Sequence, residues 1–204
     1  MITEAGHFSL ISAFILSAVQ MSLPLYGAHK GELRYMELAR TTAIAQFSLV
    51  LISFAALINA FVTSDFSVLN VVLNSHSDKP LLYKISGAWG NHEGSLLLWV
   101  LILTLFGAMV ATFGRNLPPQ LRARTLAIQG MIAFGFIAFM LFTSNPFERV
   151  LLPPANGQGL NPLLQDPGLA FHPPFLYFGY VGLSISFSFA VAALIEGKVD
   201  AAWA

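Results

Sequence analysis

Long apolar runs separated by polar connections dominate this chain. Five of the runs are about 20 residues long, which is the length needed to cross the hydrocarbon layer of a membrane as a helix. They lie near residues 7–27, 41–63, 95–114, 125–144 and 173–195. Because a backbone surrounded by lipid must satisfy its own hydrogen bonds, each run predicts a membrane-spanning helix. The expected fold is an all-α integral membrane protein, a bundle of about five transmembrane helices that forms a single domain over residues 1–204.

The composition supports a membrane protein and excludes several classes of function. Hydrophobic residues make up 56% of the chain, 18 of its 204 residues are phenylalanine, and only 10% are charged. A formal net charge of zero leaves no basic surface for nucleic-acid phosphates, so nucleic acid is not expected as a partner. Because the sequence has no cysteine, it holds no disulfide, no thiolate metal site and no covalently attached c-type haem.

The basic residues predict how the bundle is oriented, because Lys and Arg concentrate in connections on the cytoplasmic side. Placing the first and third connections and the C-terminal tail inside puts seven basic residues inside and three outside. The seven are Lys30, Arg34, Arg40, Arg115, Arg122, Arg124 and Lys198, and the three are Lys79, Lys84 and Arg149. The N-terminus is then outside and the C-terminus inside. Both long connections, 64–94 and 145–172, are expected on the outer face, which is therefore the expected functional face.

His172 is the first candidate for chemistry, because it precedes Pro173 and Pro174 at the start of the last apolar run. Prolines fit the first turn of a helix and push the preceding residue into an extended conformation, so we expect the helix to begin at Pro173 with His172 flanking it. The positive end of the helix dipole favours the neutral imidazole that a metal ion requires. His172 is thus a candidate metal ligand, or a histidine that hydrogen-bonds a loop carbonyl at the membrane interface.

Aromatic residues surround His172 in the sequence and admit two interpretations. They are Phe171, Phe175, Tyr177, Phe178 and Tyr180. Such rings form an apolar wall for a flat macrocycle, or they form the aromatic belt that is common where helices meet the membrane surface. The residues alone favour the belt for most of the rings.

A second polar group precedes the third apolar run. Asn91 is expected to cap that helix, and Glu93 in its first turn interacts favourably with the helix dipole. His92 lies between them, and Trp89 is expected near the outer interface. Ionisable groups at a membrane entrance are costly, so the group is a functional candidate. The alternative is a capped helix with a contact between His92 and Glu93.

No other pattern in the sequence points to a reaction. The sequence contains no Ser-His-Asp set, no metalloprotease helix motif and no phosphate-cradling glycine loop. His7, His29 and His76 are scattered without a shared helical face, and we assign them no role. A hydrolase or a nucleotide-binding enzyme is therefore not expected.

Two segments closely resemble the CcmF family of cytochrome c maturation proteins. They read WGNHEGSLLLW at residues 89–99 and LAFHPPFLYFGYVG at residues 169–182. The likeness runs from the N-terminal MITEAGH to Trp203, with both motifs in the same order. CcmF proteins are the haem lyase subunits of a tryptophan-rich haem-handling group.

The resemblance implies a role in haem handling. It implies that a haem chaperone delivers b-type haem on the outer face, and that the protein positions this haem for thioether attachment to apocytochrome c. Thiol-reducing and apocytochrome-binding maturation subunits are the further partners implied, together with membrane lipid. In the family, the histidine of the FHPP motif is one of two outer ligands to the haem iron, and it falls on His172. The residues expected around the haem with it are Phe171, Phe175, Tyr177, His92, Glu93 and Trp89. Iron, vinyl groups and partner thiols perform the reaction, while the protein ligates and orients.

The resemblance also implies that these residues are the N-terminal portion of a larger protein. Family members are much longer and carry a tryptophan-rich outer loop, a second outer histidine and a histidine pair within the membrane, none of which is present here. We expect a fragment, or one piece of a protein encoded in pieces that reassemble by helix packing. The expected location is the bacterial inner membrane or the mitochondrial inner membrane. A competing hypothesis is a membrane scaffold or transporter subunit whose outer aromatic residues bind a lipid or a quinone without haem.

Overall fold

The computed structural model describes residues 1–197, except for the side chain of Leu169. Among these residues there are seven α-helices, two 3₁₀ helices and a single β-bridge. The long helices are α1 (Ile2–Lys30), α2 (Leu33–Val62), α5 (His92–Phe113), α6 (Pro119–Thr143) and α7 (Pro167–Glu196). The short ones are α3 (Leu69–Asn74), α4 (Leu81–Gly87), η1 (Gly114–Asn116) and η2 (Pro162–Leu164).

The five long helices confirm the predicted all-α membrane fold. Each is long and apolar enough to cross a membrane. The helices extend beyond the apolar runs, and α2 begins at Leu33 instead of near residue 41. A helix continues past the hydrocarbon layer at little cost, because most of its backbone groups remain paired within the helix and water reaches the others. Hydrophobicity therefore marks the part of a helix that lies in lipid, not the full length of the helix.

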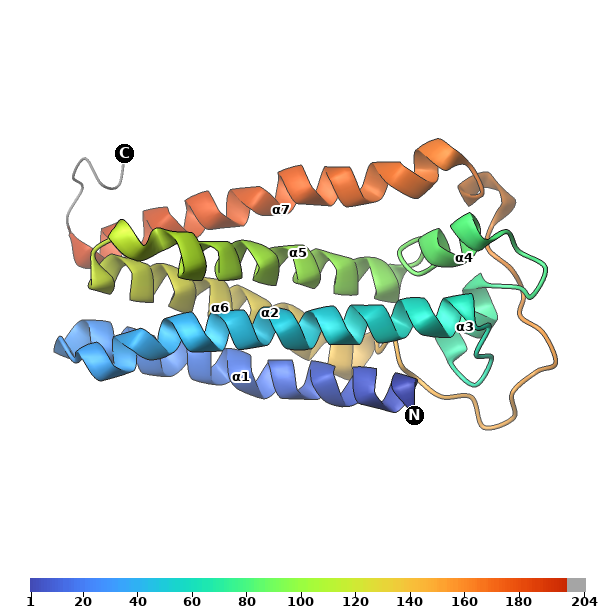
Figure 1. Ribbon diagram of the computed structural model, residues 1–204, viewed down its shortest axis with the longest axis horizontal. Helices are drawn as coiled ribbons and strands as arrows, with labels where there is room; N and C mark the ends of the chain where they lie inside the picture. Colours follow the sequence, from blue (N-terminus) through green and yellow to red (C-terminus); the bar gives the residue numbers. More distant parts are fainter. Residues whose placement is uncertain (198–204) are drawn as a thin grey trace.

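Figure 1 shows an elongated bundle in which the two long connections and the short helices α3 and α4 gather at the end where the chain starts. α7 ends at the opposite end of the bundle. α1 and α2 are antiparallel and joined by a tight turn, in which Gly31 has a φ of 74° and donates its N–H to the Gly27 carbonyl. Glycine adopts this left-handed conformation without steric cost, so the two helices can reverse direction within a few residues.

α5 and α6 form the interior of the bundle, whereas α7 lies at its edge. In the apolar part of α5 and of α6, 50% of the residues are buried, compared with 22% in α7. Gln129 of α6 donates its side-chain amide to Ser188 at 2.9 Å and to Ser184 at 3.2 Å, both on α7. Hydrogen bonds of this kind help to hold helices together in lipid. α7 is therefore attached to the bundle along one side and exposes the other.

The direction of the bundle across the membrane stays a prediction from the basic residues. The start of α1 and the end of α7 lie at opposite ends of the bundle, as that prediction requires. Lys198, which was counted with the inner tail, and Trp203 lie outside the described residues. We refer to the end that carries Met1 and the long connections as the outer end, and to the other as the inner end.

Candidate functional site

The two long connections pair with each other and form one layer over the outer end. The backbone N–H of Leu69 donates to the Glu148 carbonyl at 2.8 Å, next to the β-bridge between Val68 and Arg149. Farther along both connections, the Gln158 N–H donates to the Val72 carbonyl at 2.7 Å. These bonds make the layer a folded structure instead of two independent loops.

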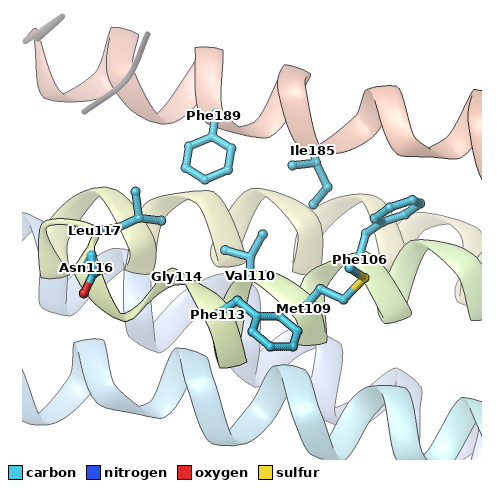
Figure 2. Close-up of a pocket in the computed structure, with 9 residues that line it drawn as sticks. All are labelled: Phe106, Met109, Val110, Phe113, Gly114, Asn116, Leu117, Ile185 and Phe189. Atoms are coloured by element: carbon cyan, nitrogen blue, oxygen red, sulfur yellow. The ribbon is translucent and has the colours of Figure 1, made fainter. Parts of the chain in front are cut away.

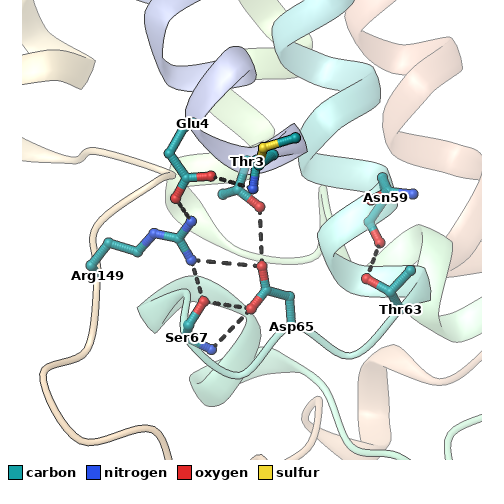
Figure 3. A network of polar contacts seen from close by, with 8 residues as sticks. Thr3, Glu4, Asn59, Thr63, Asp65, Ser67 and Arg149 are labelled. Atoms are coloured by element: carbon teal, nitrogen blue, oxygen red, sulfur yellow. Dashed lines mark hydrogen bonds and ion pairs between the residues drawn. The ribbon is translucent and has the colours of Figure 1, made fainter.

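A polar network joins this layer to the start of the chain (Figure 3). The Arg149 guanidinium contacts Glu4, Ser67 and, at 3.6 Å, the Asp65 carboxylate. The Thr3 hydroxyl donates to Asp65 Oδ2 at 3.0 Å. Burial raises the pKa of Asp65, but hydrogen bonds from Ser67 and Thr3 and the charge of Arg149 outweigh it, so the pKa lies below its ordinary value. Sequence reasoning missed this network, because nothing local indicates which polar residues of separate segments meet.

The WGNHEG motif forms the corner between α4 and α5. Asn91 caps α5 as predicted, because its Oδ1 accepts from the Gly94 N–H at 2.8 Å. Its Nδ2 also donates to the Gly87 carbonyl at 2.7 Å, which ties the end of α4 to the start of α5. At Gly94 the backbone approach excludes any side chain, since a Cβ there would lie 1.6 Å from the Ala88 carbonyl oxygen. Two of the six motif residues thus shape the corner itself.

Lys79 packs against this corner. In the sequence it contributes only to the pattern of basic residues that predicts the orientation of the bundle. Its side-chain ammonium donates to the Asn74 carbonyl at 2.9 Å, and the residue is 8% exposed. A Cβ on Gly87 would lie 2.9 Å from the same nitrogen, so the amine fills the space against α4. Burial and the positive charge of Lys84 lower the pKa of Lys79 to about 8. The stability of the corner therefore depends on whether the Lys79 amine is protonated.

Trp89 connects the corner to α7 and so joins two motifs that are far apart in the sequence. Its indole Nε1 donates to the carbonyl of Ala170, 81 residues later, at 3.0 Å. Ala170 is 1% exposed, and the Trp89 ring packs against the main hydrophobic core. The two segments that carry the family resemblance therefore lie in contact at the outer end.

A pocket of about 320 Å³ lies where the two motifs meet. Its lining residues are Ser86, Trp89, Gly90, Asn91, His92, Ser95, Leu160, Leu164, Pro173 and Tyr177. The His92 ring is held edge-to-face against Phe139 with ring centroids 6.3 Å apart. Three residues predicted for the site, Trp89, His92 and Tyr177, thus share one pocket.

Glu93 does not share this pocket with His92. It lines a smaller pocket of about 60 Å³ together with Asn70 and Glu148. Neighbouring residues on a helix point about 100° apart, which explains the separation. No hydrogen bond joins His92 to Glu93 within residues 1–197. The structure therefore separates two residues that adjoin in the sequence.

The predicted start of the last long helix is wrong. α7 begins at Pro167, and His172 lies inside the helix instead of flanking it. Asp166 accepts a hydrogen bond from the Gly168 N–H at 2.8 Å, and Pro167 occupies a first-turn position that suits proline. The Asp-Pro pair was the local signal for this start. Because His172 is more than one turn into α7, the effect of the helix dipole on its imidazole is smaller than expected.

His172 lies on the exposed side of α7, beside the pocket and not in its lining. Four of the five predicted aromatic residues are exposed with it, and only Tyr177 is partly buried; the four are Phe171 at 56%, Phe175 at 76%, Phe178 at 48% and Tyr180 at 65%. The ring nitrogens of His172 make no hydrogen bond within residues 1–197, so the expected alternative of a bond to a loop carbonyl is not formed there. The imidazole therefore faces the surroundings of the bundle.

Residues 1–197 contain no group of three or more His, Asp or Glu side chains that would hold a metal ion. A haem iron has a different requirement, because the porphyrin fills four positions and each axial position needs one side chain. An exposed imidazole with unpaired nitrogens and neighbouring aromatic rings fits one axial position. The described residues thus fit half of a two-ligand haem site.

A second large hollow lies between α5 and α7 toward the inner end. Figure 2 shows Phe106 and Val110 of α5 opposite Ile185 and Phe189 of α7. The hollow has a volume of about 460 Å³, and Asn116 supplies the only polar side chain in its lining. It offers no reactive group, and its apolar walls suit a hydrocarbon chain.

Comparison with known proteins shows relatives along the whole chain. Residues 89–202 match the family described as "Cytochrome C assembly protein", and this segment contains both motifs. Over its full length the chain is 65% identical to a cytochrome c-type biogenesis protein of Rhodobacter capsulatus and 46% identical to the cytochrome c-type biogenesis protein CcmF of Escherichia coli. It covers 31% of the first relative and 32% of the second, about a third of each.

A solved structure shares the helical arrangement. The cytochrome c heme lyase CcmF superposes with a TM-score of 0.84 and 26% sequence identity over 99% of this chain and 32% of that chain. The family match covers more than half of the sequence, including the corner, the outer part of α7 and every lining residue of the pocket except Ser86. The chain therefore belongs to the cytochrome C assembly protein family.

Proposed function

We propose that this chain acts in c-type cytochrome biogenesis by binding haem at its outer end and positioning it for thioether attachment to apocytochrome c. His172 takes one axial position of the haem iron. The observation that carries the proposal is the exposed, unpaired imidazole of His172 beside the junction of the two motifs. Membership of a cytochrome c assembly family supports the same assignment.

Haem is a substrate in this proposal, and the chain's own residues hold and orient it. The exposed rings of Phe171 and Phe175 provide apolar surface on which a flat macrocycle can pack. Trp89, His92 and Tyr177 line the neighbouring pocket and contact the haem periphery. Glu93 lies in a different pocket and takes no part in haem contact.

The second axial ligand comes from residues outside this chain. The side of α7 that carries His172 is exposed, and the chain spans about a third of the relatives that it matches. The remaining part of the protein packs beside α7, supplies that ligand and brings the tryptophan-rich surface. A haem chaperone delivers the haem, and thiol-reducing and apocytochrome-binding subunits bring the apocytochrome.

Substitution of the ligand tests the proposal in the assembled protein. We expect His172→Ala to lower occupancy of the outer haem at least tenfold, to abolish its bis-histidine absorption spectrum and to lower the yield of cytochrome c. His29→Ala, an exposed histidine at the inner end, serves as the matched control and should change none of these. Unchanged occupancy and yield in His172→Ala would refute the ligand role.

The outer end faces the extracytoplasmic side of a bacterial inner membrane in this proposal. The absence of native cysteine allows a direct test with single introduced cysteines. A membrane-impermeant maleimide added to intact cells should label Leu152→Cys, which is 87% exposed in the outer layer. It should leave Gln120→Cys at the inner end unlabelled until the membrane is opened. The reverse pattern would invert the orientation.

The hollow shown in Figure 2 favours a second function, a membrane subunit that binds a lipid or quinone tail. That function predicts purified complexes with bound apolar ligand and no haem absorption. Absorption spectroscopy of the assembled protein, together with lipid extraction, separates the two functions.

A further inference from the structure

Pro174 leaves a gap in the hydrogen bonding of α7. In an α-helix, each carbonyl accepts from the N–H four residues later, and proline has no N–H to donate. The carbonyl of Ala170 therefore has no donor at Pro174, although α7 continues through this position without a break. Ala170 is 1% exposed, so bulk water does not reach this carbonyl.

Trp89 supplies the donor that Pro174 lacks. Its indole N–H bonds the Ala170 carbonyl at 3.0 Å, within the normal range for this bond. Leaving a buried carbonyl without a partner is costly, so this contact stabilises the outer part of α7. It thus offsets part of the cost of continuing the helix through the proline pair that was expected to begin it.

The indole is itself held in a fixed position. The Trp89 backbone N–H donates to the Ser86 carbonyl at 3.1 Å, at the end of α4. Its ring stacks on Phe54 of α2, with centroids 6.4 Å apart and an interplanar angle of 20°. Because Trp89 is fixed within the corner, its bond to Ala170 fixes the outer part of α7 relative to the corner.

The contact lies close to His172 and far from the other polar attachments of α7, which are the bonds from Gln129 and the ion pair between Arg124 and Glu196 at 3.1 Å. Ala170 precedes His172 by two residues, a rise of about 3 Å along the helix. The bonds from Gln129 hold α7 near Ser184 and Ser188, several turns farther along the helix. Among the polar contacts that join α7 to the rest of the bundle, the bond from Trp89 is thus the nearest to His172.

We propose that Trp89 is a positioning residue for His172, acting through the Ala170 carbonyl that Pro174 leaves unpaired. The inference rests on the proposed haem ligation by His172 and adds the element that aims this ligand. Trp89 does so without touching the iron, and the bond links the WGNHEG corner to ligand geometry on α7.

A double-mutant cycle in the assembled full-length protein tests the inference. Trp89→Phe keeps the stack on Phe54 but removes the N–H, and Pro174→Ala restores the helical N–H to the Ala170 carbonyl. We expect Trp89→Phe to lower outer-haem occupancy about tenfold and to shift its reduction potential, corresponding to the loss of one buried hydrogen bond. The double variant should recover most of the occupancy and potential. Trp99→Phe, a tryptophan of α5 packed on Phe136, is the matched control and should behave as the unmodified protein.

The outcomes separate this inference from the proposed function. If His172→Ala abolishes the haem signal but Trp89→Phe leaves occupancy and potential unchanged, the positioning role is wrong and the ligand role stands. Equal impairment of Trp89→Phe and the double variant also overturns the positioning role, because the missing N–H is then not the cause. If His172→Ala has no effect, both proposals fail, whatever Trp89→Phe does.

Discussion

The corner formed by residues 89–94 and the outer part of α7 over residues 171–180 lie side by side, yet they differ in how far the chain itself completes their contacts. In the corner, Asn91 bonds two backbone groups, Gly94 touches the Ala88 carbonyl and Trp89 bonds α7. On α7, Phe175 is 76% and Tyr180 65% exposed. The same family resemblance covers both segments.

The contrast separates residues that the fold itself explains from residues that it leaves exposed. A polar or aromatic residue whose partners lie within the chain is explained by the architecture, as Asn91 and Gly94 are. A histidine and aromatic rings that remain exposed at the end of an apolar helix face either the lipid interface or a partner from elsewhere. Contacts within the chain therefore account for the corner, whereas they leave one side of the outer part of α7 exposed.

The largest effect is expected at Gly94, because the backbone around it leaves no room for a side chain. Gly94→Ala forces a methyl group to within 1.6 Å of the Ala88 carbonyl oxygen. We expect the free energy of unfolding to fall by about 3 kcal/mol or more, measured by denaturant titration in detergent micelles. Gly179→Ala on α7 is the control, since a Cβ there meets nothing within 4 Å. Equal losses for both variants would erase the distinction between the two regions.

The next effect is a pH dependence that belongs to the corner. Because the pKa of Lys79 is lowered to about 8, the folded protein binds fewer protons than the unfolded chain between pH 8 and the ordinary lysine value of 10.5. Stability should therefore rise with pH through this window, by about 2 kcal/mol. Lys79→Met should remove this rise when unfolding is measured from pH 7.5 to 10.5. Parallel pH profiles for the two proteins would show that the amine is not buried in the folded state.

A smaller loss is expected when the cap of α5 is removed. Asn91→Ala deletes the acceptor for the Gly94 N–H and the donor to the Gly87 carbonyl. Capping residues contribute about 1 kcal/mol, so the free energy of unfolding should decrease by that amount when it is measured by denaturant titration. Asn91→Asp keeps the acceptor and should recover most of the loss. A neutral Asn91→Ala would mean that other contacts hold the corner.

The smallest effect on stability is expected on the exposed side of α7. Phe175→Ala should change the free energy of unfolding of this chain by less than about 0.5 kcal/mol, because the ring has few contacts within it. In the assembled protein the same variant should weaken haem retention, measured by absorption after dialysis. A large loss of stability in the isolated chain would place Phe175 with the supporting residues instead.

Local features of the fold were predictable from the sequence, and long-range ones were not. Hydrophobic length located the five long helices, and a side-chain oxygen before an apolar run located the Asn91 cap. The predicted start of α7 is too late, because prolines inside a helix remove hydrogen bonds and are therefore expected at its first turn, whereas here another segment pairs one of the freed carbonyls, that of Ala170. That partner, Trp89, is 81 residues away and gives no local signal.

The candidate site shows the same division. The resemblance singled out His172, His92 and Trp89, but only the structure shows that His92 lines a pocket with Trp89 while His172 lies outside it. Sequence adjacency suggested a joint role for His92 and Glu93, and helix geometry separates them into different pockets. The direction of a side chain depends on helix register, which a motif alone does not specify.

The bond between Glu4 and Arg149 joins residues that are 145 positions apart in the chain. It therefore constrains the order in which parts of this protein assemble during synthesis. While the chain is being synthesised, α1 enters the membrane long before Arg149 leaves the ribosome, so Asp65 must wait for its cation, whereas Glu4 already pairs with the N-terminal ammonium at 2.8 Å. The outer layer therefore closes only after α6 has been inserted, and the helices assemble before the surface that covers them. A chain arrested before residue 149 would contain Asp65 without the arginine that later pairs with it.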